Sequence, residues 1–389
     1  MRFPKRVPQG GTIGFVAPSF GCSIEPYRSS FDASLKMWEK AGYRTELGPN
    51  CYASEGIGIS STPESCGREL MESYVNRTSD ALISCGGGEL MCEILDHVDF
   101  DRIKEADPKW YMGYSDNTNF TFTLTTMCDV ASIYGPCAAN FGRKNMHQSI
   151  IDAMSIFADT DSMSGKEHSG ETFFKFSGYG MWEKESLRDE EHPFEPLNLT
   201  EKTILHRFTG DGRPLSTKKI AGSEISGDPG EKANGGDAEC RNSYVEEDHI
   251  EMEGRLLGGC LDCLVNLCGT KYDHVSSFND RYADDGILWF LEACDLNVMS
   301  IRRAMWELEH AGWFDKAKGF IIGRPAHFDE PMMGLDQYAA VYDIISHHHV
   351  PILMDADVGH LSPMVPLITG SYAHVEAEGN SWSVRMELR

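Results

Sequence analysis

Basic residues are scarce in this chain of 389 residues, in which 35 Lys and Arg stand against 60 Asp and Glu and the formal net charge is -25 at pH 7. Nucleic-acid binding requires clustered Lys and Arg, because contacts to the phosphate backbone supply most of the affinity. The charge balance therefore argues against a nucleic-acid partner.

A long apolar run is missing from the N-terminal region, where residues 13–17 form the apolar stretch. A signal peptide or a membrane-spanning helix needs a clearly longer one. We therefore expect a cytoplasmic protein with no membrane partner. Its 12 cysteines are then expected to be reduced thiols, since disulfides persist mainly in oxidising compartments.

Strand and helix patterns do alternate over residues 1–158. Residues 12–18 are apolar and β-branched, and residues 27–41 carry helix-spaced Phe31, Leu35 and Trp38. Further apolar strands at 80–84 and 110–114 alternate with helical stretches. Such alternation predicts an α/β fold with a mostly parallel sheet that binds its ligand at the carboxyl ends of the strands.

The middle of the chain differs, because residues 159–253 are polar and broken. We interpret this range as a linker and insertion, with a mobile loop at 216–240, where large apolar residues are few. Apolar strand and helix patterns return over residues 254–389 and end in an alternating stretch typical of antiparallel strands. They predict a second, smaller α+β domain.

One short stretch, WYMGYSDNTNF (110–120), places Ser115 and Asp116 where a predicted strand passes into a helix. Either side chain would serve as a helix cap. Alternatively, Ser115 is a nucleophile on a tight turn, which requires a His as base and a carboxylate to orient that His. GYSD matches the first four positions of G-x-S-x-G, but Asn117 replaces the second Gly.

Three other candidates also lie at the ends of predicted strands. Glycines 86–88 offer backbone amides to an oxyanion, or simply form a turn. Glu292 is an acid in the apolar run LWFLEAC, where a buried carboxylate needs a partner unless it faces outward. His360 follows VPILMDADVG, where a structural role is the alternative.

Metal and nucleotide motifs are incomplete. Cys260 and Cys263 have C-x-x-C spacing, but a tetrahedral zinc site needs four ligands and this segment otherwise reads as a buried helix. Glycines 86–88 lack both the G-x-G-x-x-G pattern and the P-loop Lys. We therefore predict neither a metal nor a cofactor.

Five blocks in chain order resemble the LD-carboxypeptidase family of serine peptidases, which also contains the microcin C self-immunity hydrolases. The run PKWYMGYSDNTNF (108–120) is similar to the family signature PK-x-x-x-GYSD. The other blocks are SCGGGE (84–89), GRLLGGCLDCLVNLCGTKY (254–272), ILWFLEACD (287–295) with GWFDKAKGFIIGRP (312–325), and VPILMDADVGHLSPMVPLITG (350–370).

The resemblance implies a triad in which Ser115 is the nucleophile, His360 the base and Glu292 the residue that orients it. It implies an oxyanion hole formed by the amides of Gly87 and Asp116. The implied fold is a Rossmann-like N-terminal domain, similar to class I glutamine amidotransferase domains, with a barrel-like C-terminal domain and the active site between them. A homodimer is also implied.

Two substrate classes follow from the resemblance. One is a murein tetrapeptide, cleaved at its L–D amide to release terminal D-alanine; the other is an aminoacyl- or peptidyl-nucleotide antibiotic. Gly88 and Cys260 are expected to line the substrate pocket. Trp182 is expected to stack on a nucleotide base or, alternatively, to anchor a loop to the core. An inactive protein that binds cell-wall peptides is a third possibility, against which the intact triad argues.

Overall fold

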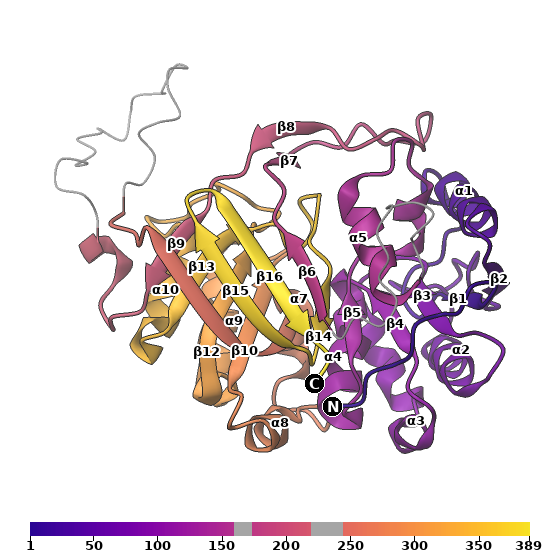
Figure 1. Cartoon of the computed structure of the whole chain (residues 1–389), viewed down its shortest axis with the longest axis horizontal. Helices are drawn as coiled ribbons and strands as arrows, with labels where there is room; N and C mark the ends of the chain where they lie inside the picture. The colour runs from indigo at the N-terminus through magenta and orange to yellow at the C-terminus, as the bar shows by residue number, and fades with distance from the viewer. Residues whose placement is uncertain (159–172, 219–243) are drawn as a thin grey trace.

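The computed structural model describes residues 1–158, 173–218 and 244–389, which build two large sheets side by side (Figure 1). The first sheet has the strand order β14-β5-β4-β3-β1-β2, and β1 to β5 run parallel. Only β14, from the C-terminal part of the chain, is antiparallel to its neighbour. The bounds are β1 (Thr12–Val16), β2 (Arg44–Leu47), β3 (Ala81–Ser84), β4 (Trp110–Gly113), β5 (Ser132–Tyr134) and β14 (Leu367–Thr369).

Helices cover both faces of this first sheet, as a parallel sheet requires. Successive strand residues point to opposite faces, so Leu82 joins one apolar cluster and Ile83 the other. The helices of this half are α1 (Tyr27–Lys40), α2 (Pro63–Val75), α3 (Phe100–Glu105), α4 (Thr118–Cys128) and α5 (Gln148–Phe157), with the 3₁₀ turns η1 (Met91–His97), η2 (Ser115–Asn117) and η3 (Ala138–Gly142). The predicted α/β fold is confirmed.

The second sheet has the order β6-β16-β15-β10-β11-β12-β13-β9, with a parallel centre of β10 to β13 and antiparallel strands on both sides. Its bounds are β6 (Phe173–Ser177), β9 (His206–Thr209), β10 (His249–Cys260), β11 (Ile287–Glu292), β12 (Ala317–Gly323), β13 (Pro351–Ala356), β15 (Tyr372–Glu378) and β16 (Ser381–Glu387).

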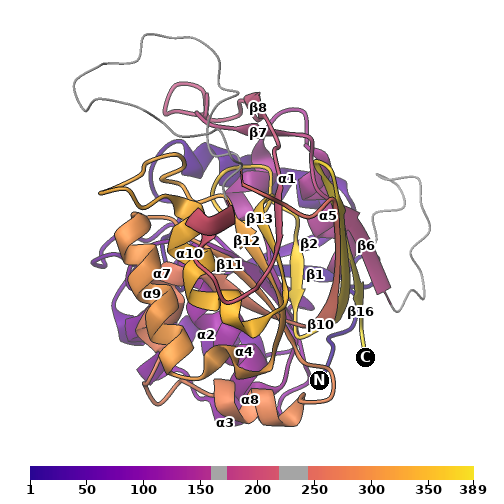
Figure 2. The same ribbon diagram turned by 90° about the vertical axis from the view of Figure 1, so that its left-hand side faces the viewer.

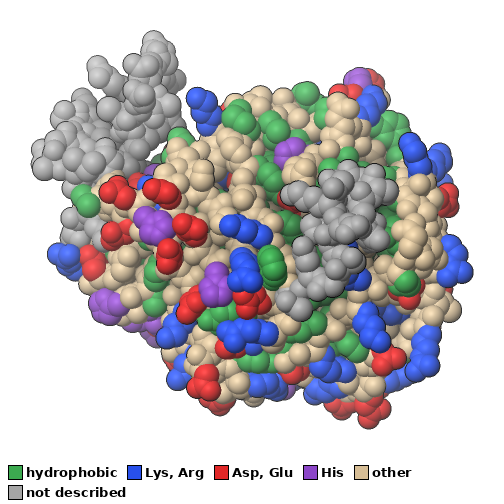
Figure 3. Space-filling view, viewed as in Figure 1, with side chains coloured by type: hydrophobic (Ala, Val, Ile, Leu, Met, Phe, Trp, Pro, Cys, Tyr) green, Lys and Arg blue, Asp and Glu red, His purple; other side chains and the backbone are tan. Residues whose placement is uncertain are grey.

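One face of the second sheet is covered by helices over β11 to β13 and carries charged side chains over β15 and β16, whereas the opposite face is apolar and buried. Figure 2 shows α7, α9 and α10 gathered on the covered face. The antiparallel strands β15 and β16 alternate buried and accessible residues, and Glu251, His374 and Arg385 line their outer side. Acidic, basic and His side chains are mixed on this face (Figure 3). The helices and turns of this half are α7 (Leu261–Leu267), α8 (Val275–Arg281), α9 (Val298–His310), α10 (Gln337–Ile345), η4 (Leu215–Lys218), η6 (Trp313–Lys316) and η7 (Ser346–His348).

The two halves share a core through α4. The ring of Phe122 on α4 stacks on Trp313 with centroids 5.2 Å apart, and Trp313 stacks on Trp289 of β11 at 5.8 Å. Because α4 begins just after Ser115 and β11 ends at Glu292, this aromatic stack fixes the two candidate site residues relative to each other.

The middle segment differs from the expected polar linker. It supplies both edge strands of the second sheet, β6 and β9, and a separate hairpin of β7 (Met181–Glu183) and β8 (Leu199–Lys202). In β6, FFKFS, only alternate residues are buried, so the strand looks polar unless its partner β16 is known. Most of the predicted mobile loop, residues 219–240, lies outside the described residues. No helix in the described ranges is long and apolar enough to cross a membrane.

Candidate active site

Ser115 lies at the carboxyl end of β4, on the turn that leads into η2 and α4. Its φ of 62° is in the left-handed region, which non-glycine residues rarely adopt and which often marks a functional turn. Asn117, which replaces the second Gly of the elbow motif, donates from Nδ2 to the carbonyl of Gly86 at 2.8 Å. The serine turn is thus tied to the glycine loop that follows β3.

The three residues predicted as a triad form a chain of two hydrogen-bond contacts, with His360 in the middle. Ser115 Oγ is 2.9 Å from His360 Nε2, and His360 Nδ1 is 2.8 Å from Glu292 Oε2. Ser115 comes from the first sheet, whereas Glu292 ends β11 and His360 follows β13 in the second. A nucleophile, a base and an orienting carboxylate require this chain of contacts.

The Glu292–His360 pair is buried and its electrostatics are coupled. Burial opposes ionisation of Glu292, but His360, Tyr134 and Cys260 together hold the pKa of Glu292 below its usual value. Burial likewise opposes the charging of His360, yet the charge of Glu292 and a hydrogen bond to Cys294 raise the pKa of His360 well above its ordinary value. The pair therefore favours an imidazolium beside a carboxylate.

Tyr134 is a site residue that sequence reasoning missed. It lies at the end of β5, and its buried hydroxyl donates to Glu292 Oε1 and accepts the amide hydrogen of Ser115 at 3.3 Å. In the sequence it is one more apolar residue of a short strand, SIY. Its location in the site becomes evident only from the pairing of β5 with β4, the strand that ends near Ser115.

The glycine loop lies directly against the serine. A Cβ on Gly87 would lie 3.1 Å from both Cβ and Oγ of Ser115, and one on Gly88 would meet Ser19 Oγ at 2.1 Å. The loop can therefore approach Ser115 only because these positions lack side chains.

The carboxylate of Asp116 ties the serine turn to two other segments. Its Oδ2 accepts from Ser19 Oγ and from the amide of Met91, and its Oδ1 accepts from Asn119 Nδ2. Burial raises the pKa of Asp116 to about 6, although these three donors favour its charged form. The side chain thus holds the turn, while the backbone amide of Asp116 adjoins Ser115.

A cavity of about 770 Å³ opens over Ser115 and His360, between the carboxyl ends of strands from both sheets. Gly87, Gly88 and Cys260 all line it. Hydrogen bonding to Cys263 and burial raise the pKa of Cys260 well above that of a free thiol. Cys260 is therefore a neutral thiol in the cavity wall, opposite Glu292 in the β10–β11 register.

Trp182 is not among the described residues that line this cavity. It is 4% exposed, its Nε1 donates to the carbonyl of Lys202 at 3.2 Å, and its ring packs on Phe328 and under the guanidinium of Arg324. Such contacts fit the alternative in which Trp182 anchors a loop to the core. Stacking on a nucleotide base would require the ring to leave them.

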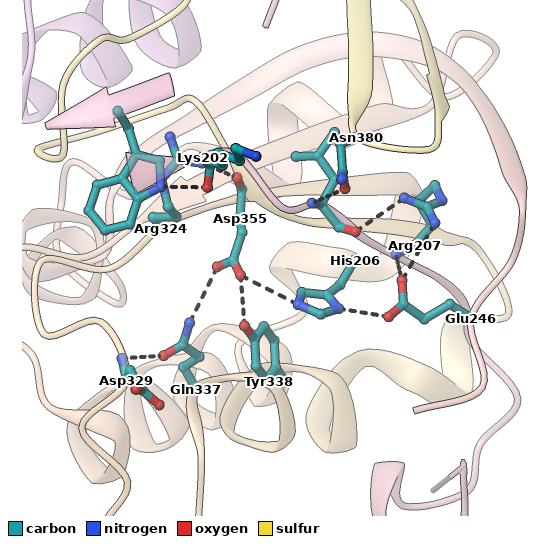
Figure 4. Close-up of polar contacts among 12 residues, drawn as sticks. Lys202, His206, Arg207, Glu246, Arg324, Asp329, Gln337, Tyr338, Asp355 and Asn380 are labelled. Carbon is teal, nitrogen blue, oxygen red and sulfur yellow. Dashed lines mark hydrogen bonds and ion pairs between the residues drawn. The ribbon is translucent and has the colours of Figure 1, made fainter. Parts of the chain in front are cut away.

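A buried polar network surrounds Asp355, a few residues before His360 in the chain (Figure 4). Asp355, at the end of β13, accepts from Tyr338 and Gln337 and lies 3.9 Å from His206. Arg324 donates to the carbonyl of Asp355 at 2.6 Å and forms an ion pair with Asp357. The backbone is thus held from two sides only a few residues before His360.

Possible metal ligands lie elsewhere in the described residues. Two groups are close enough to hold an ion, namely Glu309 with His347 and His348, and His249 with Glu251 and Glu376. Neither belongs to the cavity lining. Each oxygen of Glu309 already lies within 3.0 Å of one imidazole.

Comparison with protein families identifies both halves of the chain. Residues 13–135 match the LD-carboxypeptidase N-terminal domain, and residues 253–375 match the LD-carboxypeptidase C-terminal domain. The fold and the family are those of a serine peptidase, a hydrolase. The chain belongs to the LD-carboxypeptidase family, as the sequence blocks indicated.

Individual relatives fall into two groups. The chain is 22% identical over 376 residues to the microcin C7 self-immunity protein MccF of Escherichia coli, covering 96% of this chain and 93% of that one. It is 20% identical over 391 residues to a Vibrio cholerae protein named as a carboxypeptidase, covering 99% and 98%.

Solved structures of both groups have the same fold. A mutant of MccF in complex with adenosine monophosphate gives a TM-score of 0.73 at 18% identity, covering 99% of this chain and 98% of that one. Muramoyltetrapeptide carboxypeptidase from Oxalobacter formigenes gives 0.62 at 17%, covering 97% and 98%.

Proposed function

We propose that the protein is a serine carboxypeptidase that cleaves the L–D amide of a murein tetrapeptide and releases terminal D-alanine. The observation that carries the proposal is the continuous contact from Ser115 Oγ through His360 to Glu292, with distances of 2.9 and 2.8 Å. Its location in a cavity of about 770 Å³ gives room for a short peptide.

In the proposed reaction, Ser115 Oγ attacks the carbonyl carbon of the scissile amide while His360 Nε2 takes the serine proton. Glu292 holds the imidazole by Nδ1 and stabilises its positive charge. His360 then gives the proton to the leaving nitrogen as the C–N bond breaks, which leaves an ester on Ser115. Water, activated by the same imidazole, hydrolyses that ester.

The amides of Gly87 and Asp116 are the proposed oxyanion hole. Both belong to segments that flank Ser115, and no described backbone carbonyl outside their own elements accepts from either amide. Free amides beside the nucleophile can stabilise the negative charge that develops on the carbonyl oxygen.

The second candidate keeps the same chemistry and changes the substrate to an aminoacyl- or peptidyl-nucleotide. The similarity to MccF along 96% of the chain supports this candidate. The buried position of Trp182 weighs against it, because Trp182 was the residue expected to stack on the base. An inactive binding protein is disfavoured by the intact contacts of all three triad residues.

Mass spectrometry after incubation with a murein tetrapeptide ending in D-alanine tests the proposal, with Ser115→Ala as the control. Loss of one alanine with the wild type alone is the expected result. Cleavage of an aminoacyl sulfamoyl-adenylate but not of the tetrapeptide would favour the second candidate. Equal turnover by wild type and Ser115→Ala would overturn the triad.

The family resemblance further supports a cytoplasmic homodimer. Light scattering of the purified protein should give twice the 43.4 kDa mass of one chain. A monomeric mass would contradict the dimer and leave the reaction proposal unaffected.

A further inference from the structure

Two arginines that belong to no predicted motif lie beside the cavity. Arg188 lines the cavity of Ser115 and His360. Arg143 lines a smaller adjoining hollow of about 40 Å³, which shares Tyr114 and Asn140 with the main cavity. Both arginines lie in connecting segments, Arg143 directly after η3 and Arg188 between β7 and β8.

The segment that carries Arg188 is anchored next to Arg143. The amide of Lys144 donates to the carbonyl of Phe194 at 2.7 Å, and Ser30 Oγ donates to the carbonyl of Pro193 at 2.6 Å. The guanidinium of Arg188 lies over the ring of Tyr27 at 5.1 Å. Its position is therefore set by packing as well as by the backbone.

Both guanidinium groups have unused donors. In the part of the chain that the structure describes, Nη1 of Arg143 and Nη1 of Arg188 are buried and donate to no acceptor. The acid closest to Arg143 is Glu183, with its Oε2 at 3.7 Å from Nη1. Two arginines and one glutamate leave one positive charge, and buried charged donors without acceptors are costly.

The two arginines also influence each other. Burial and then the charge of Arg188 lower the pKa of Arg143, and the hollows that the two side chains line share Tyr114 and Asn140. An anion with two oxygens could accept from both and would neutralise the remaining charge.

Acidic side chains line another part of the same cavity. Glu89, Asp262 and Asp295 line it, and burial, followed by the charges of the two aspartates, raises the pKa of Glu89. A carboxylate of the substrate would be repelled there. Within the described lining, the arginine end is the favourable place for it.

We propose that Arg143 and Arg188 bind the α-carboxylate of the residue that leaves, and so restrict cleavage to the C-terminal residue of a peptide. This assignment rests on the proposed carboxypeptidase function. The ring of Tyr114 lies 5.1 Å from that of His360, and Tyr114 also borders the hollow of Arg143. The arginine end is thus on the side of His360, which protonates the leaving amine.

The covalent structure of a terminal amino acid matches this arrangement. Its carboxylate carbon is two bonds from the amide nitrogen, so the carboxylate lies close to the nitrogen that His360 protonates. A peptide that continues beyond this residue has a neutral carbonyl there and would leave both guanidinium groups without an anion. The arginines would therefore make the enzyme an exopeptidase.

The test compares the tetrapeptide that has a free terminal carboxylate with the same peptide carrying a C-terminal amide. Arg188→Gln and Arg143→Gln should raise KM for the free acid about 10- to 100-fold, the factor expected for one or two hydrogen bonds to a charged group. Both variants should leave kcat nearly unchanged and hydrolysis of the amide unaffected. Equal losses on both peptides, or a wild type that does not prefer the acid, would overturn the assignment.

Arg28→Gln is the matched control. Arg28 also lies over a tyrosine ring, that of Tyr52 at 5.5 Å, but is not among the described residues that line the cavity. It should alter neither KM nor the preference for the acid. A shift in that preference equal to that of Arg188→Gln would show that the effect is one of surface charge and would overturn the proposal.

A binding measurement separates this inference from the proposed reaction. Calorimetry on Ser115→Ala protein should detect binding of D-alanine, and adding Arg188→Gln should abolish it, even if no peptide is cleaved. Binding of inorganic phosphate but not of D-alanine would assign the arginines to a phosphate group instead. Absence of binding by both probes would overturn the anion site itself.

Discussion

The buried hydroxyl of Tyr134 donates a hydrogen bond to Oε1 of Glu292. Since Oε2 of the same carboxylate contacts His360, both oxygens of Glu292 are engaged. The tyrosine oxygen in turn accepts from the amide of Ser115, so one hydroxyl connects the acid and the nucleophile of the proposed triad. A buried carboxylate stays ionised only when such donors replace its water.

Replacing Tyr134 by Phe should therefore weaken both stability and turnover. Glu292 loses a donor that lowers its pKa, and the Ser115 amide loses its acceptor. We expect the free energy of unfolding to fall by about 1–3 kcal/mol, the cost of an unsatisfied buried polar group. We also expect kcat to fall about 10-fold or more, because the turn shifts. Urea denaturation and steady-state kinetics measure the two effects.

Tyr282→Phe is the control for this substitution. The hydroxyl of Tyr282 donates to Asp129 Oδ1 at 2.6 Å, away from the described cavity lining. It should cost stability and leave kcat unchanged. A Tyr134→Phe enzyme with wild-type kcat would show that the tyrosine is structural only.

Activity should be lost on the acid side at a higher pH than for an ordinary histidine. Only neutral His360 accepts the serine proton, and Glu292 raises the pKa of His360 well above 6.5. As pH falls through that pKa, kcat/KM should therefore decline. The profile of kcat/KM between pH 5 and about 10 measures it.

Glu292→Gln identifies the group responsible for this acid limb. The amide removes the charge that raises the pKa of His360, so the limb should move to lower pH. The maximal rate should fall about 10³- to 10⁴-fold, because the imidazole loses its orienting carboxylate. An acid limb that stays in place would mean that another group titrates.

Local sequence patterns place the three triad candidates but not their partners. Ser115, Glu292 and His360 each follow an apolar strand, and parallel strands gather their carboxyl ends at one edge. Tyr134 is a different case, since its acceptor Glu292 is 158 residues away and its own strand reads as ordinary core. The resemblance to the family, and not the local periodicity, indicated which of the candidate residues act together.

The edge strands and the arginines were missed for related reasons. β6 and β9 pair with β16 and β13, which come much later in the chain, so their short alternating patterns have no local support. Arg143 and Arg188 lie in connecting segments that no periodicity describes. Their roles depend on which side chains the fold places beside them, and a linear pattern does not encode that.

Gly87→Ala should reduce turnover with little effect on stability. A Cβ at Gly87 would be 3.1 Å from Oγ of Ser115, and no positive φ adds backbone strain there. The added methyl must push the serine or the loop by a few tenths of an ångström, which we expect to lower kcat about 10- to 100-fold. Gly180→Ala, whose Cβ would meet nothing within 4 Å, is the control. If Gly87→Ala had the kcat of the wild type, Gly87 would not be part of the proposed oxyanion hole.

The carboxyl of Asp116 should make stability depend on pH. Burial raises the pKa of Asp116 to about 6, above its value of about 3.9 in an unfolded chain, so the folded state holds this proton more tightly. Its contribution is fully present below pH of about 4 and is lost as pH rises through about 6, by up to about 3 kcal/mol. In Asp116→Asn this part of the dependence should vanish. The difference between the two stability curves, from urea denaturation at each pH, measures it; parallel curves would contradict the assignment.

Trp182 should matter for folding and not for the choice of substrate. Its ring is buried against Phe328 and Arg324, so Trp182→Ala should lower the free energy of unfolding by about 3–5 kcal/mol. Because it does not line the cavity, KM for a murein tetrapeptide and for an aminoacyl-nucleotide should change by the same factor.

Trp182→Phe, which retains an aromatic ring, keeps the comparison possible if the alanine variant does not fold. Trp306→Ala, which removes a 53% exposed ring, should change neither stability nor KM substantially. A rise in KM confined to the nucleotide substrate would mean that Trp182 leaves its buried position to stack on the base. Aminoacyl-nucleotides would then be the favoured candidate substrate.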